Sequence, residues 1–221
     1  MTLHEATAAF APHEALAAQL LSTLGPAGTD GSHDLSHLLR VWRNAAAIAA
    51  TESGCDMTLL AAAAILHDCV AVEKDSPLRA QASRLAAARA REIVGALGWP
   101  GPRVDGLAHA IEAHSFSAGI APETLEARIL QDADRLDAIG AIGVARCFYV
   151  GGRMGSALYD PLDPDATARA LDDRRFAFDH FSAKLFRLAD GFATRAGQAA
   201  ATERVATMRS FVAAFRSEVD R

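Results

Sequence analysis

Apolar positions recur along almost the whole chain at the three- and four-residue spacing of an α-helix. Alanine and leucine occupy most of these positions, and the alternation of valine, isoleucine and threonine that marks strands is nearly absent. The pattern therefore predicts an all-α protein. The expected helices cover residues 12–24, 32–52, 57–69, 78–97, 102–113, 123–134, 167–189 and 193–219.

Turn-forming and capping residues separate the expected helices. A stretch rich in glycine and proline over 25–31 ends the first helix, and it lacks the pattern of a phosphate-binding P-loop. Asp56 can cap the third helix, and Pro102 suits the first turn of the fifth. The glycines in 151–156 predict a flexible loop.

Composition limits the classes of function. The chain has 221 residues, of which 51% are hydrophobic, so it can bury a core of its own. Its formal net charge of -5 argues against nucleic acid as a partner. It shows neither a signal peptide nor an apolar stretch long enough for a bilayer, so we expect a cytoplasmic protein outside the membrane. The three cysteines are scattered, which suits a reducing compartment and excludes a cysteine zinc site.

Histidine and aspartate end one of the most apolar runs. His67 and Asp68 close the run 59–66, which is expected to be buried. An imidazole and a carboxylate are costly to bury unless something compensates them, and a divalent metal ion would compensate both. His37 upstream and Asp134 downstream would supply the remaining protein ligands. Taken alone, His37 is more often a hydrogen-bonded, partly buried histidine than a ligand.

A second acidic stretch favours the same interpretation. Asp132, Asp134 and Asp137 stand within six positions in an otherwise apolar setting. They cannot all face the core, and a buried carboxylate needs a cation or several hydrogen-bond donors. On the second expected helix, Asn44 shares a face with His37, so this face is not a purely apolar stripe.

These stretches resemble the HD-domain superfamily of metal-dependent phosphohydrolases. The resemblance rests on His37–Val41, Leu66–Asp68 and Ala133–Leu136, and the segments 112–117, 131–140, 158–161 and 180–185 are similar to a small, single-domain bacterial branch. It implies one all-α HD domain over 1–221, with about five core helices around one metal site. The site core would cover about 32–150, and C-terminal helices over about 167–219 would pack on it.

The resemblance also implies the metal site and the reaction. The implied ligands are His37, His67, Asp68 and Asp134. Two imidazoles and two carboxylates suit Mn²⁺, Fe²⁺, Co²⁺, Ni²⁺, Zn²⁺ or Mg²⁺ and leave positions for water. Such an ion lowers the pKa of its water and polarises a phosphoryl oxygen. The expected activity is hydrolysis of a phosphate ester or anhydride.

The favoured substrate is a nucleotide, cleaved by a (d)NTP pyrophosphohydrolase or a nucleotidase. One alternative is a di-iron oxygenase on the same scaffold, for which His109 and His114 are the only further histidine candidates in the central region. Another is a metal-binding regulatory protein without catalysis. The expected partner is a small phosphorylated molecule, and a homodimer stays open.

The candidate catalytic groups are Asp68, Glu73 and His114, with Asp75 as an alternative to Glu73. Asp68 could bridge the ion and orient the water, and Glu73 or Asp75 could act as general base. Some HD nucleotide hydrolases carry an acidic pair soon after the His-Asp pair, whereas here Glu73 is the first acid, so the base stays open between Glu73 and Asp75. His114 could contact phosphate or could cap its helix as a cation. The charged residues 73–75 could equally be a solvated loop.

Basic residues are the candidates for substrate binding. They are Arg40, Lys74, Arg135 and Arg153. Arg135 could instead pair with Asp132 or Asp137 as a structural bridge, which the sequence slightly favours. Arg153 could contact a phosphorylated substrate, or its loop could be a plain mobile connector. The GYP-type insertion of cyclic-dinucleotide phosphodiesterases is missing after His114.

Overall fold

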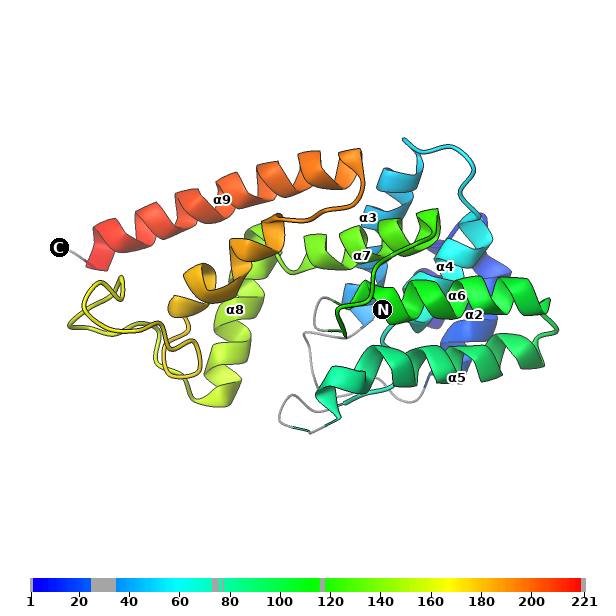
Figure 1. Ribbon diagram of the computed structural model, residues 1–221, viewed down its shortest axis with the longest axis horizontal. Coiled ribbons are helices and arrows are strands. Elements are labelled where there is room, and N and C mark those ends of the chain that lie inside the picture. Colours follow the sequence, from blue (N-terminus) through cyan, green and yellow to red (C-terminus); the bar gives the residue numbers. More distant parts are fainter. Residues whose placement is uncertain (1, 25–34, 73–75, 77, 116–117, 220–221) are drawn as a thin grey trace. The chain divides into compact units, whose positions relative to one another are not determined.

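The computed structural model describes residues 2–24, 35–72, 76, 78–115 and 118–219 (Figure 1). The α-helices are α1 (Leu3–Ala8), α2 (Glu14–Thr23), α3 (Leu35–Ala49), α4 (Met57–Leu66), α5 (Ala82–Ala96), α6 (Gly101–His114), α7 (Leu125–Asp137), α8 (Gly140–Met154) and α9 (Arg195–Val219). Short helical turns cover Arg79–Gln81, Phe181–Leu185 and Arg187–Ala189. Over these residues the only extended pairing is an isolated bridge between Ala157 and Phe176. The all-α prediction is confirmed.

The chain divides into two compact units, Met1–Asp134 and Arg135–Arg221. The boundary falls inside α7, so one helix contributes residues to both units. Each unit is described by itself below. The single domain expected over 1–221 stays a prediction.

The buried helix α4 lies at the centre of the first unit. All eight residues of 59–66 are buried, as expected for a helix that is apolar on every side. The Asp56 carboxylate accepts hydrogen bonds from the N–H groups of Thr58 and Leu59, each at 3.0 Å, and so caps the helix. The helix ends at Leu66, three residues earlier than predicted, and His67 follows as its C-cap.

A helical hairpin brings the end of α6 back toward the start of α5. Helices α5 and α6 pack closely, and α4 packs on both α3 and α6. The turn between α5 and α6 uses Gly98 at φ 80°, a conformation that glycine adopts without strain. Pro102 lies in the first turn of α6, as predicted, and His114 is its last residue.

The second unit is held together by phenylalanine rings between α8, α9 and the segment before α9. Neighbouring ring centroids lie 4.6–6.2 Å apart. The rings belong to Phe148, Phe178, Phe181, Phe186, Phe211 and Phe215. At these separations aromatic pairs add to the stabilisation from buried area.

Two local predictions in the second unit are wrong. The helix expected over 167–189 is replaced by irregular backbone with short turns, because aspartate side chains capture backbone N–H groups. Asp163, for example, accepts from the N–H groups of Thr167 and Ala168 at 2.9 and 2.8 Å.

The other error concerns the loop expected over 151–156, since 151–154 form the last turn of α8. Gly151 lies there because a Cβ atom would come within 2.9 Å of the Ala177 Cβ atom. The helix ends at Met154, and Gly155 follows as its C-cap at φ 75°.

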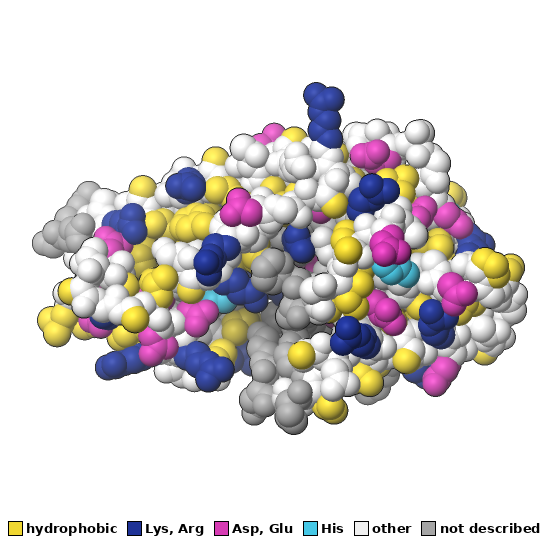
Figure 2. Space-filling model, viewed as in Figure 1, with side chains coloured by type: hydrophobic (Ala, Val, Ile, Leu, Met, Phe, Trp, Pro, Cys, Tyr) yellow, Lys and Arg dark blue, Asp and Glu magenta, His cyan; other side chains and the backbone are white. Residues whose placement is uncertain are grey.

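The described surface carries both signs of charge. On the face drawn in Figure 2, basic and acidic side chains are interspersed rather than gathered into one large patch. No helix in the described ranges combines the length and the apolar character that a membrane crossing requires.

Candidate metal centre

His67 is held in one tautomer at the end of α4. The side chain is fully buried, and its Nδ1–H donates to the Ala64 carbonyl oxygen at 2.9 Å. Burial lowers the pKa of His67 to about 4, so the ring is neutral at neutral pH. With its proton on Nδ1, the ring presents a lone pair at Nε2.

The other three implied ligands surround this lone pair. His37, from α3, places its Nε2 atom 3.1 Å from His67 Nε2. Asp134 Oδ1, from α7, lies 3.6 Å from His37 Nε2 and 3.9 Å from His67 Nε2. Asp68 Oδ2 lies 3.8 and 3.6 Å from the same two atoms. Four side chains from three separate segments therefore meet within 4 Å of the imidazole nitrogens.

These distances fit ligands that share one cation. Metal–ligand distances near 2.0–2.2 Å place neighbouring ligand atoms roughly 3–4 Å apart. His37 and His67 are buried, Asp134 is half-buried and Asp68 is exposed. Two imidazole nitrogens and two carboxylate oxygens are electron-pair donors, and a positive ion relieves the repulsion between them. The chemistry of this donor set could hold a divalent metal.

His114 lies next to both Asp68 and His67 and extends the cluster. Its Nδ1–H donates to the Ile111 carbonyl at 2.6 Å, so this ring also presents Nε2. That Nε2 atom lies 3.8 Å from Asp68 Oδ1, and the ring stands edge-on to His67 at a centroid distance of 4.9 Å. Asp68 therefore directs one oxygen toward the His37–His67 pair and the other toward His114.

The remaining sequence candidates are more dispersed. Glu73, Lys74 and the alternative base Asp75 lie outside the described residues. Arg40, on α3, donates to the Ser36 hydroxyl at 2.8 Å. His109, the other histidine considered for a second iron, accepts from the Glu123 N–H at 2.9 Å and belongs to neither metal-binding group found among the described side chains.

Two candidate arginines belong to the second unit. Arg135 donates to the Gly191 carbonyl at 2.8 Å, a structural contact with a partner that the sequence did not suggest. Asp137, one of its expected partners, is buried and pairs with Arg146 at 2.6 Å. Arg153 lies in the last turn of α8, with its guanidinium 5.8 Å from the centre of the Tyr149 ring.

Of the three aspartates in the acidic stretch, Asp132 and Asp137 are buried and Asp134 is half-buried. The two carboxylates outside the metal cluster therefore take the most buried positions. Sequence reasoning gave no role to Gln131, whose amide N–H donates to the Ala113 carbonyl at 2.6 Å. Its position one helical turn before Asp134 is the feature of the sequence that could have indicated a role near the site.

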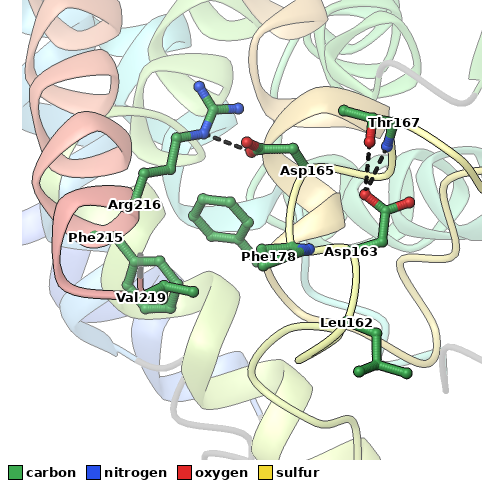
Figure 3. Close-up of a pocket in the computed structure, with 9 residues that line it drawn as sticks. Leu162, Asp163, Asp165, Thr167, Phe178, Phe215, Arg216 and Val219 are labelled. Atoms are coloured by element: carbon green, nitrogen blue, oxygen red, sulfur yellow. Dashed lines mark hydrogen bonds and ion pairs between the residues drawn. The ribbon is translucent and has the colours of Figure 1, made fainter. Parts of the chain in front are cut away.

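The second unit contains a surface pocket of about 230 Å³ (Figure 3). Phe178 and Phe215 form part of its wall, and Arg216 pairs with Asp165 at 2.5 Å. None of the predicted site residues that the structure describes lines this pocket. Its polar groups satisfy one another, so the pocket offers less chemistry than the histidine cluster.

Comparisons with known proteins agree with the arrangement in the first unit. Residues 34–139 match the family described as the HD domain. The chain is 31% identical to YpgQ of Bacillus subtilis (strain 168) over 191 aligned residues. The alignment covers 85% of this chain and 84% of YpgQ.

Solved structures extend the similarity to nearly the whole chain. A Lactobacillus plantarum protein has a TM-score of 0.70 and 32% identity over 92% of this chain and 96% of its own. The structure of B. subtilis YpgQ in complex with ADP has a TM-score of 0.65 and 31% identity, covering 85% and 90%. An HD-superfamily hydrolase from Bacillus thuringiensis has a TM-score of 0.68 and 26% identity, covering 99% and 96%.

Proposed function

Because the chain belongs to the HD-domain superfamily of hydrolases, as its motifs predicted, we propose that it is a metal-dependent phosphohydrolase acting on a nucleotide. The observation that carries the proposal is the group of His37, His67, Asp68 and Asp134, whose imidazole nitrogens each lie within 4 Å of both carboxylates. We propose these four as the protein ligands. A bound divalent ion would supply an acidified water and polarise a phosphoryl oxygen.

The chain's own groups would orient the reactants. Asp68, with its two oxygens directed to different sides, is proposed to hold the attacking water. His114 directs its Nε2 atom toward Asp68, and this position supports a role in transferring that water's proton. Glu73 stays the alternative base. Arg40 and Lys74 are proposed to bind phosphate oxygens, and Arg135 and Arg153 stay candidates from the sequence alone.

A nucleotide is favoured over other phosphate compounds because YpgQ, which is 31% identical to this chain, was crystallised with ADP. Two concrete reactions follow from the proposal. A (d)NTP pyrophosphohydrolase releases pyrophosphate and a monophosphate, whereas a nucleotidase releases inorganic phosphate.

The test is turnover of nucleotides by protein first stripped of metal and then loaded with Mn²⁺. A panel of NTPs, dNTPs, NDPs and NMPs is assayed separately for phosphate and pyrophosphate. We expect Mn²⁺-dependent release of one of them, abolished in His67→Ala and kept in His109→Ala, a histidine variant outside the cluster. If folded, metal-loaded protein turned over no phosphate compound, the proposed reaction would be wrong.

A second candidate follows from the additional group of His67, Asp68 and His114, whose ligand atoms lie within 4.8 Å of one another. This group could hold a second ion, as a di-iron oxygenase requires. Two irons per chain together with oxygen uptake would favour that function. One equivalent of metal without any turnover would instead favour a regulatory metal-binding protein.

A further inference from the structure

Helix α7 carries Asp134 into the cluster, and its apolar side chains Ala127, Ile129, Leu130 and Ala133 are fully buried. Asp134 Oδ1 lies within 4 Å of the Nε2 atoms of His37 and His67, which come from other segments. Apolar burial is not directional, so hydrogen bonds are needed beside it to fix the register of α7.

One such contact comes from α3. The side-chain amide of Asn44 donates to the Ala133 carbonyl oxygen at 3.1 Å. Only the NH₂ group of an amide can donate to a carbonyl, so the orientation of Asn44 follows from its partner. Ala133 directly precedes Asp134, and Asn44 lies two turns after His37 on the same face of α3. This bond therefore links the backbone beside one proposed ligand to the helix that carries another.

The second contact is made by a side chain of α7 itself. Gln131, one turn before Asp134, is 5% exposed, and its amide donates to the Ala113 carbonyl at 2.6 Å. Ala113 directly precedes His114 at the end of α6. Two side-chain amides thus tie α7 to α3 and to α6, each at the backbone carbonyl just before a residue of the cluster.

We propose that Asn44 and Gln131 are positioning residues that hold Asp134 at the metal site. The proposal rests on the proposed metal-dependent function, since it presumes that Asp134 is a ligand. Neither amide is a ligand itself, and each acts through the register of α7. Groups that orient metal ligands in this way commonly change metal affinity by about 10–100-fold when removed.

The test is the affinity for Mn²⁺, measured by calorimetric titration of metal-free protein. The variants are Asn44→Ala and Gln131→Met, which remove the amide donors. The matched control is Trp42→Phe. Trp42 also lies on α3 and donates a side-chain N–H to a backbone carbonyl, that of Ala9, at 2.8 Å. All variants are checked for helical content and melting temperature.

We expect each amide variant to weaken Mn²⁺ binding by about tenfold or more. Trp42→Phe should lower the melting temperature but keep Mn²⁺ affinity within about twofold of the wild type, because its bond does not touch α7. If Asn44→Ala fails to fold, Gln131→Met carries the test.

The inference is overturned if the amide variants bind Mn²⁺ as tightly as Trp42→Phe does. A wild-type protein that binds no divalent ion would overturn the proposed function as well. The two failures are therefore distinguished by the wild-type titration.

Discussion

The carboxylates of the candidate metal centre and the buried carboxylates of the second unit have different neighbours. In the first unit, imidazole nitrogens and carboxylate oxygens of the cluster face one another at 3.6–3.9 Å. In the second unit, the buried Asp179 receives two hydrogen bonds from Arg169 at 2.5 and 2.9 Å. Asp137 is likewise paired with Arg146.

This difference in neighbours distinguishes a candidate binding site in the first unit from a structural ion-pair network in the second. An arginine fork satisfies a carboxylate within the chain, so the pair needs nothing from outside. A cluster of imidazole lone pairs and carboxylates instead gains most from a bound metal cation. We therefore expect changes in the first cluster to alter metal binding and changes in the second network to alter stability.

Asp68→Ala should give the largest effect. It removes a proposed ligand, so metal binding and turnover should be lost together, with activity falling by about a thousandfold or more, while the helices remain. The measurements are Mn²⁺ titration, nucleotide turnover and circular dichroism. Asp105→Ala is the control, because Asp105 is an exposed aspartate paired with Arg91. Full activity in Asp68→Ala would show that the cluster in the first unit is not the binding site.

Asp179→Ala should show the reverse pattern. It removes the buried carboxylate that accepts hydrogen bonds from Arg169 and from the Asp172 N–H, so the free energy of unfolding should fall. Mn²⁺ affinity should not change. Urea unfolding measures the loss, and Asp165→Ala, which breaks the exposed pair with Arg216, should cost under about 1 kcal/mol. Equal losses in both variants would contradict the structural role assigned to Asp179.

Acidification should give the smallest effect, in metal-free protein. The pKa of His67 is about 4 in the folded chain, whereas an unperturbed histidine has a pKa of 6.5, so the unfolded chain binds more protons between these values. Stability contributed by the neutral ring is present above pH 6.5 and is lost as the pH falls toward 4, by roughly 2 kcal/mol at pH 4.5.

Urea unfolding of the metal-free protein between pH 7 and 4.5 measures this loss. The decline should be reduced in His67→Leu, which cannot take up the proton. It should persist in His109→Ala, whose histidine lies outside the cluster. A wild-type stability that does not change over this range would mean that His67 is not held neutral by burial.

The sequence predicted local features well where one residue type decides them. Asp56 caps α4, and Pro102 opens α6, because each acts on its own helix turn. It failed where distant contacts decide. The glycines near 151 indicated a loop, but Gly151 serves close packing against Ala177. The helical pattern over 167–189 gave way to aspartate side chains that bind backbone N–H groups.

The sequence by itself determined which side chains could bind a cation, because imidazole and carboxylate groups are properties of single residues. It also determined that the chain is helical, because hydrophobic periodicity is a local pattern. Only the tertiary structure decided that the ends of α4 and α6 meet side chains of α3 and α7, and that His67 and His114 both present Nε2. It also decided that Asn44 and Gln131 link α7 to α3 and α6. Distances between segments far apart in sequence depend on helix packing, which no local pattern specifies.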